Sequence, residues 1–438
     1  MAGSALGDIG VDALAEAVGA LCRTDYARRE GEPFSAKAYR VRRVGGVRYT
    51  YVKVTSGVLR ARDEVRTISG VCKVAAILAP QGGRLLPMGE AHAGQTAALA
   101  GLSARPGERI GDGFGLEAPE TVPLMSVQVE PTAPLTQSAL LAHLREMEEE
   151  DPLLSVRPEA DGVSVGVMGA VQVEVLQGIL AARFGDVVRM CPPHVLYKET
   201  IAAPVVGIGH YEPLRHYAEV WLKLEPGAPG SGISFAADCL PNSLDENWQR
   251  LIRTHVFERA HPGVLTGSPL CDVRIRLIAG RAHLKHTEGG DFREATCRAI
   301  RNALMQAENV LLEPVVRFEL AMPNEALARV TGELLRIGAQ LDASETDGGE
   351  TTLTGRCTAA MFWDYPTRFA ASTHGHGRIA SRFERYEPCK NQDDIVRQSG
   401  YDPLADTLNP PGSVFCSHGA GFYVAWDHVR EWAHCEVE

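Results

Sequence analysis

The chain has 438 residues, of which 45% are hydrophobic and 23% are charged, and its formal net charge is −11. This length predicts about three domains, and the composition is that of a folded globular protein. The net negative charge argues against indiscriminate binding to nucleic acid, which needs a basic surface. No apolar run reaches the roughly 20 residues of a membrane span, and the N-terminus lacks the features of a signal peptide. We therefore expect a cytoplasmic protein without a membrane partner.

The first hundred or so residues predict one helix followed by a small β-barrel. Apolar residues recur at helical spacing over Gly7–Leu21, and Asp12 is positioned to cap that helix. Residues 33–118 are rich in Val and Gly and form short alternating runs separated by glycine turns, which is typical of a barrel.

Charge is distributed unevenly along the chain. The segment Lys37–Lys53 contains four arginines and no acid, whereas Glu146–Asp151 is strongly acidic. Both segments are compatible with ordinary solvated faces. A local basic patch of this kind could also bind RNA in spite of the net charge, and the sequence leaves both interpretations open.

Two stretches, Met125–Lys198 and Pro314–Tyr386, show the same order of elements. Each has an apolar strand, a helix, a hairpin, a second helix and a last strand, which predicts a ferredoxin-like βαββαβ domain. The expected hairpin turns are Asp161-Gly162 and Asp347-Gly348. The expected last strands end at Tyr197 and Tyr386.

Between these units, residues 199–313 predict an α+β domain that carries a short loop on a rigid stem. Ser243 with Glu246, and Asp291 with Glu294, each have the spacing of a capping box. The strand Asp272–Ile278 and the second capped helix would hold the loop Ala279–Gly290 as a tip. His283, Lys285 and His286 on this tip are either solvated polar residues or contacts to RNA phosphates and bases.

Two further clusters have alternative interpretations. Arg368, His376 and Arg378 flank a glycine-containing turn that either ends a helix or approaches a phosphate backbone. Cys416 and His418 could form a nucleophile and a base, or join a zinc site with other residues. These other candidates are Cys389, His434 and Cys435. The spacing fits no common zinc pattern, and buried cysteines are frequent, so structural packing is the favoured interpretation.

The motifs of several catalytic sites are missing from the sequence. It contains no GxxxxGK[ST], HExxH, GxSxG or GxGxxG pattern. We expect no catalytic residue and no metal ligand in the favoured interpretation. A standalone hydrolase or metal protein that uses Cys416 and His418 is the alternative from another functional class.

The order of these modules resembles elongation factor G after its GTPase domain. Motifs resembling the last guanine-contacting loop and the last helix of such a domain are Gly3-Ser4-Ala5 and Gly10-Val11-Asp12-Ala13-Leu14. Motifs resembling the barrel of translation factors are Ser56-Gly57-Val58-Leu59, Ala93-Gly94-Gln95 and Ile110-Gly111-Asp112. Motifs resembling the last domain are Tyr365-Pro366-Thr367-Arg368, Gly377-Arg378 and Tyr386-Glu387-Pro388.

Within this superfamily, the chain resembles the tetracycline ribosomal-protection proteins. The residues that carry this resemblance are Glu130-Pro131, Asp151-Pro152-Leu153-Leu154, Met168-Gly169, Val173-Glu174-Val175, Tyr197-Lys198-Glu199-Thr200, Gly230-Ser231-Gly232 and Asp291-Phe292-Arg293. The tip Ala282–His286 departs from the family, whose members carry an aromatic and proline-containing tip there. An elongation-factor-G paralogue acting in translocation or ribosome rescue is therefore the alternative within the superfamily.

The resemblance implies an α+β multidomain fold: a β-barrel, two ferredoxin-like domains flanking an α+β domain, and a small C-terminal extension. The implied ranges are 1–28 for a GTPase-domain remnant, 33–118, 123–198, 199–313, 314–388 and 389–438. Ser4 and Ala5 would remain from a nucleotide site, so this chain alone is expected neither to bind nor to hydrolyse GTP, although its parent would use GTP and magnesium.

The resemblance also implies the ribosome as partner, bound by a monomer. Candidate contacts to the decoding centre are His283, Leu284, Lys285 and His286, and candidate contacts to rRNA are Arg368, His376 and Arg378.

Overall fold

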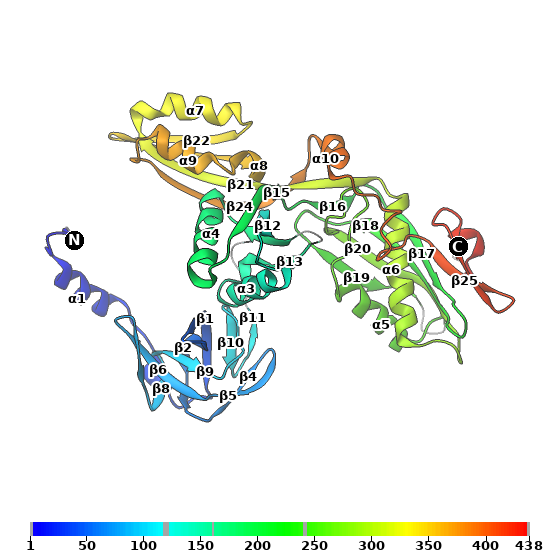
Figure 1. The fold of residues 1–438 in the computed structure, drawn as a ribbon, viewed down its shortest axis with the longest axis horizontal. Helices are drawn as coiled ribbons and strands as arrows, with labels where there is room; N and C mark the ends of the chain where they lie inside the picture. Colours follow the sequence, from blue (N-terminus) through cyan, green and yellow to red (C-terminus); the bar gives the residue numbers. More distant parts are fainter. Residues whose placement is uncertain (1–2, 117–121, 160–161, 240–242, 436–438) are drawn as a thin grey trace. The chain divides into compact units, whose positions relative to one another are not determined.

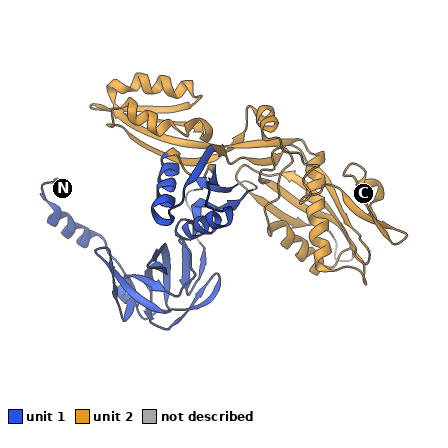
Figure 2. Cartoon of the chain, in the orientation of Figure 1, with its two compact units in different colours: residues 1–123, 127–167, 171–192 blue, residues 124–126, 168–170, 193–438 orange. Residues whose placement is uncertain are grey.

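The computed structural model describes residues 3–116, 122–159, 162–239 and 243–435. The chain divides into two compact units, which are coloured separately in Figure 2. Unit 1 comprises residues 1–123, 127–167 and 171–192, and unit 2 comprises the remainder, chiefly residues 193–438. Figure 1 shows the helices and strands of both units with their labels.

Unit 1 begins with two helices, α1 (Val11–Leu21) and α2 (Tyr26–Arg29). The predicted helix Gly7–Leu21 is too long at its start, because Gly10 adopts a left-handed conformation with φ 76° and ends the preceding turn. The Asp12 side chain lies in the first turn and does not cap the helix. No side chain of α1 is buried.

The predicted barrel is a set of antiparallel strands around one apolar core. Seven strands form one sheet in the order β11-β10-β1-β2-β9-β6-β7, and β3-β8 and β4-β5 form two ribbons. Alternate residues along these strands, such as Ala36, Val52 and Leu99, fill the core. The bounds are β1 (Ser35–Val44), β2 (Val47–Ser56), β3 (Val58–Arg60), β4 (Glu64–Thr67), β5 (Gly70–Lys73), β6 (Ala76–Gln81), β7 (Arg84–Pro87), β8 (Glu90–His92), β9 (Thr96–Ala100), β10 (Glu108–Gly111) and β11 (Gly115–Leu116).

The first βαββαβ domain has the predicted order of elements. Its sheet order β13-β14-β12-β15 is that of a ferredoxin-like fold, with the first and third strands adjacent in the centre. Asp161 of the predicted hairpin turn lies outside the described residues. The last strand ends at Val195, so Tyr197 falls in the connection that follows it. The bounds are β12 (Met125–Pro131), α3 (Gln137–Glu150), η1 (Pro152–Leu154), β13 (Arg157–Pro158), β14 (Val163–Val167), α4 (Ala170–Phe184) and β15 (Val188–Val195).

The central α+β domain of unit 2 is a mixed sheet with two helices on one face. Gly207 and Gly209 allow α6 to approach β17 closely, because a Cβ on Gly209 would lie 1.9 Å from the Ala295 carbonyl oxygen. The sheet order is β19-β20-β18-β17-β25-β26. The bounds are β16 (Lys198–Ile201), β17 (Val205–Tyr211), β18 (Ala218–Pro226), β19 (Ile233–Ala237), α5 (Glu246–Phe257), β20 (Val273–Ala282) and α6 (Gly289–Gln306).

Both predicted capping boxes of this domain are displaced by one turn or less. Helix α5 is capped by Asp245, whose side chain accepts a hydrogen bond from the Asn247 backbone. Helix α6 begins at a capping box formed by Glu288 and Asp291, so Asp291 is the third helical residue and not the cap. The actual caps therefore lie two residues after Ser243 and three residues before Asp291, because other polar side chains near each helix start can accept the same backbone hydrogen bonds.

The second βαββαβ domain uses one strand that also serves the central domain. Its sheet order is β16-β21-β23-β22, with β24 pairing with β21. The predicted boundary between residues 313 and 314 falls inside β21 (Asn309–Pro323), whose first four residues pair with β16. The other bounds are η2 (Asn324–Ala326), α7 (Leu327–Arg336), β22 (Gln340–Asp347), β23 (Glu350–Thr358), α8 (Ala359–Phe362), α9 (Tyr365–Ser372) and β24 (Arg378–Pro388).

The C-terminal extension is built into the central domain. It contains α10 (Gln392–Ser399), β25 (Ser413–Ser417), β26 (Ala420–Val424) and α11 (Val429–Trp432). Strand β25 pairs in parallel with β17, so this hairpin widens the central sheet, as Figure 1 shows. Together these domains confirm the predicted α+β multidomain class. None of the described helices is both long and apolar enough to span a membrane.

Candidate nucleic-acid interface

The predicted tip is a tight turn between β20 and α6. Strand β20 continues to Ala282, so the loop is shorter than predicted and consists of residues 283–288. The Thr287 hydroxyl donates to the Tyr217 carbonyl oxygen and accepts from the His283 backbone N–H, at 2.6 and 2.7 Å. Because both ends are held, the intervening side chains project outward, and Leu284 is fully exposed.

The histidines of the tip belong to a group of aromatic rings at the base of the loop. The His283 and His286 rings stack at 4.6 Å between centroids. Tyr217 lies 6.3 Å from His283 and 5.8 Å from His434, which comes from the C-terminal extension. The structure therefore joins the two predicted histidines to two rings that are distant in sequence. Lys285 is exposed beside them and adds a positive charge.

A pocket of about 700 Å³ opens beside this group. Its lining combines the aromatic rings with cationic side chains, namely Tyr217, Arg281, Ala282, His283, Leu284, Lys285 and His434. Sequence reasoning missed Tyr217, Arg281 and His434 as members of this site. Arg281 lies only two residues before His283, which was a usable signal, whereas no local pattern connects His434 to the tip.

A buried polar network lies under the pocket and connects it to the extension. Both His210 and Glu219 have no exposed side-chain surface, and their Nδ1 and Oε2 atoms are 2.7 Å apart. Glu219 also accepts from the Trp221 indole and from the backbone N–H groups of His434 and Cys435 at 2.7–2.8 Å. Burial would raise the pKa of Glu219, but these hydrogen bonds, chiefly from His210, lower it to about 2.

Among the described residues, the potential metal ligands that gather are those of this network, and no cysteine belongs to it. The donor atoms of His210, Glu219 and His434 lie within 4.8 Å of one another. Each carboxylate oxygen of Glu219 already accepts two hydrogen bonds, so the described network is complete from protein groups alone. Of the residues considered for a zinc site, only His434 belongs to this group.

The alternative catalytic pair lies on the β25–β26 hairpin. Cys416 is the fourth residue of β25, and its backbone N–H donates to Glu212. His418 occupies the exposed turn with φ 51°. No hydrogen bond joins the two side chains among the residues that the structure describes. Cys389 follows β24, where its thiol donates to Asn391.

The second group of predicted RNA contacts surrounds one helix end in the last βαββαβ domain. Arg368 lies on α9 with its guanidinium 5.8 Å from the Tyr365 ring centroid. His376 is exposed in the following loop, and Arg378 begins β24. Arg378 forms an exposed ion pair with Glu350 at 2.7 Å, which competes with any phosphate for its charge.

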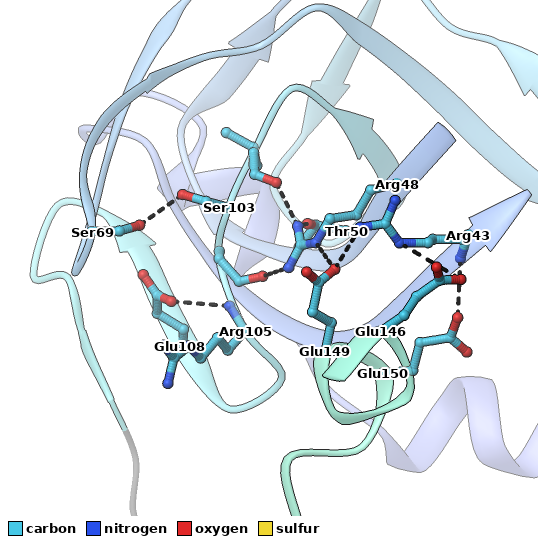
Figure 3. A network of polar contacts seen from close by, with 12 residues as sticks. Arg43, Arg48, Thr50, Ser69, Ser103, Arg105, Glu108, Glu146, Glu149 and Glu150 are labelled. Atoms are coloured by element: carbon cyan, nitrogen blue, oxygen red, sulfur yellow. Dashed lines mark hydrogen bonds and ion pairs between the residues drawn. The ribbon is translucent and has the colours of Figure 1, made fainter. Parts of the chain in front are cut away.

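The basic strand and the acidic run of unit 1 contact each other (Figure 3). Arg43 and Arg48 each lie 3.1 Å from Glu149, and Arg43 also faces Glu146. Arg48 further donates to the carbonyl oxygens of Leu102 and Ala104. Arg43 and Arg48 are therefore neither simply solvated nor free to bind RNA. They connect the barrel to helix α3, and their charges are largely paired with carboxylates within unit 1.

The predicted nucleotide-site remnant is a small exposed turn. Ser4 and Ile9 exchange two backbone hydrogen bonds of 3.0 Å, and Ala5 lies between them at the surface. This turn leads directly into α1.

Two segments of the chain match models of a translation-factor family. Residues 193–308 match the model described as elongation factor G, domain IV. Residues 310–395 match the model described as elongation factor G C-terminus. The chain therefore carries two consecutive domains of the elongation factor G type, in the order predicted from sequence.

A crystal structure of a protein from Thermus thermophilus is similar to most of the chain. The TM-score is 0.54 and the sequence identity is 24%, and the likeness covers 90% of this chain. At this identity the comparison concerns the fold alone. The chain spans 61% of the length of that relative.

Proposed function

We propose that this chain is the ribosome-binding portion of a translational GTPase. The observation that carries the proposal is the match of residues 193–308 to elongation factor G domain IV, together with the exposed tip that this domain presents. Histidine, lysine and arginine side chains on a rigid stem suit contacts to RNA phosphates and unpaired bases. His283, Leu284, Lys285 and His286 would make the contacts at the decoding centre, and Arg368, His376 and Arg378 would contact rRNA elsewhere.

GTP and magnesium would be bound by a GTPase domain joined to the N-terminal side of this chain. The support is the resemblance of the segment around Ser4 and Ala5 to the end of such a domain. The sequence contains no phosphate-binding GxxxxGK[ST] loop. The chain by itself would accordingly act as a binding arm that hydrolyses no nucleotide.

The more specific proposal is tetracycline resistance by ribosomal protection. Its support is the series of short motifs from Glu130-Pro131 to Asp291-Phe292-Arg293. The tip sequence Ala282–His286 departs from the ribosomal-protection pattern and favours the second candidate, an elongation-factor-G-like paralogue acting in translocation or ribosome rescue.

Growth in tetracycline separates these two candidates. Cells expressing the chain fused to its GTPase domain should grow at a higher drug concentration than cells with the empty vector. The same fusion with Lys285→Glu should lose the effect, because a carboxylate at the tip repels phosphate. An inhibitory concentration equal to that of the empty vector would refute the resistance role and leave the paralogue.

Ribosome binding itself is tested by co-sedimentation at increasing salt concentration. Contacts between basic side chains and rRNA predict binding that weakens steeply with salt, because condensed counterions are released on association. Failure to co-sediment at low salt would refute the proposal as a whole. Stoichiometric zinc, or a turnover lost in Cys416→Ala, would instead favour the hydrolase or metal-protein alternative.

A further inference from the structure

The C-terminal extension contributes one wall of the pocket beside the tip. Of the seven described residues that line it, six come from the central domain and the seventh is His434. The exposed ring of His434 is nearly parallel to that of Tyr217, with an interplanar angle of 13°. The Arg281 guanidinium lies against the His434 carbonyl oxygen at 3.4 Å.

The extension is fixed to the central domain at several independent points. Arg298 donates to the Gly412 carbonyl oxygen at 2.8 Å, and Asn302 donates to that of Trp426 at 2.8 Å. The Phe415 ring stacks on the buried His210 ring with 4.1 Å between centroids. Since the backbone N–H of His434 also donates to Glu219, the position of this residue is set by the fold and not by its own side chain.

The side chains that line the pocket are chiefly of two kinds, aromatic and cationic. Among the residues that the structure describes, the lining includes three aromatic rings, an arginine and a lysine, and no carboxylate. Grooves that bind single-stranded nucleic acid combine these two kinds of side chain, because rings stack on bases and cations contact the phosphates. A base inside a double helix has both faces covered by its neighbours, so it cannot offer a face to these rings.

We propose that the extension and the tip together form a binding site for one unpaired RNA nucleotide, whose base packs on the ring of His434 while its phosphate lies near Arg281 and Lys285. This inference rests on the proposed function and assigns a role to the C-terminal extension. The site is composite, because the central domain supplies the cationic wall and the extension supplies the ring of His434.

The contribution of His434 is stacking and not charge. Partial burial, and the neighbouring His210, lower the pKa of His434 below its ordinary value, which favours the neutral form of the ring. The Tyr217 hydroxyl and His434 Nδ1 are 3.0 Å apart, which orients the ring. A phenyl ring at this position should therefore support the same stacking.

The test uses fluorescence anisotropy of the full chain with a labelled single-stranded oligoadenylate, compared with the same strand in a duplex. His434→Ala should weaken binding to the single strand by about tenfold, the size expected for one base–aromatic stack. His434→Phe should restore binding close to that of the wild type. His428→Ala is the matched control, because His428 is an exposed histidine of the same extension and should leave binding unchanged.

Single-strand binding by His434→Ala equal to that of the wild type would overturn the inference. An equal loss of binding to the duplex, or to polyglutamate, would also overturn the inference. The first result would indicate a general attraction to negative charge, and the second would indicate a protein ligand. Co-sedimentation with ribosomes separates this failure from that of the proposed function. If the wild-type chain pellets with ribosomes while His434→Ala binds the single strand as tightly as the wild type, that pair of results refutes the composite site and leaves the proposed function standing.

Discussion

Replacing Glu219 by glutamine tests the buried network that holds the extension on the central domain. The carboxylate has no exposed surface, and its two oxygens accept from His210, Trp221, His434 and Cys435. A glutamine side chain keeps the volume but replaces one acceptor oxygen by an NH₂ group. Two of the present donors would then face another donor, and the charge that pairs with His210 would be lost.

The expected loss of stability follows from the pKa of Glu219. Its value is about 2 in the folded protein and 4.5 for the unperturbed group. The difference of about 2.5 units corresponds to about 3 kcal/mol at 1.36 kcal/mol per unit. Because the folded pKa is depressed, this stabilisation is fully present above about pH 4.5 and is lost as the pH falls toward 2.

Urea unfolding at neutral pH, followed by circular dichroism, should show this loss in Glu219→Gln. The variant should also lose part of the wild-type decrease in stability between pH 4.5 and pH 2, since it lacks the titrating group. Glu225→Gln on the same strand is the control, because Glu225 is partly exposed and forms ion pairs with Lys223 and Arg276 at the surface side of the strand, without the buried backbone donors that Glu219 has. If Glu219→Gln unfolds at the same urea concentration as the control, the network does not stabilise the fold as argued.

Two further predictions concern packing in each unit. A double-mutant cycle of Arg48→Ala and Glu149→Ala should give a coupling free energy of about 0.5–1 kcal/mol. The value is small because Glu149 is partly exposed to solvent, and it should decrease further with added salt. A coupling no larger than that of the exposed Arg145–Glu148 pair would refute the connection between barrel and α3. Gly209→Ala should destabilise unit 2 by about 1–3 kcal/mol in urea unfolding, since its Cβ would meet the α6 backbone. Gly290→Ala should not destabilise it, because a Cβ at Gly290 would point into open space. Equal losses of stability in the two variants would contradict this account.

Much of the architecture could be predicted from local pattern. The period-2 and helical runs of the two βαββαβ domains predicted the correct order of elements, because alternate burial along a strand and one apolar face along a helix are properties of the sequence itself. The helix caps were less predictable. Ser243 and Asp245 both precede α5 and both have side chains suited to a cap, and in the structure Asp245 is the cap.

The sequence by itself determined the modules, their order and the exposed tip with His283 and Lys285. Only the tertiary structure decided what those residues face. The Arg48–Glu149 pair joins residues 101 positions apart, and the His434–Glu219 bond joins residues 215 positions apart. No local periodicity encodes such contacts, because they depend on which strand edges pair and on how the last segment returns to the sheet beside β17.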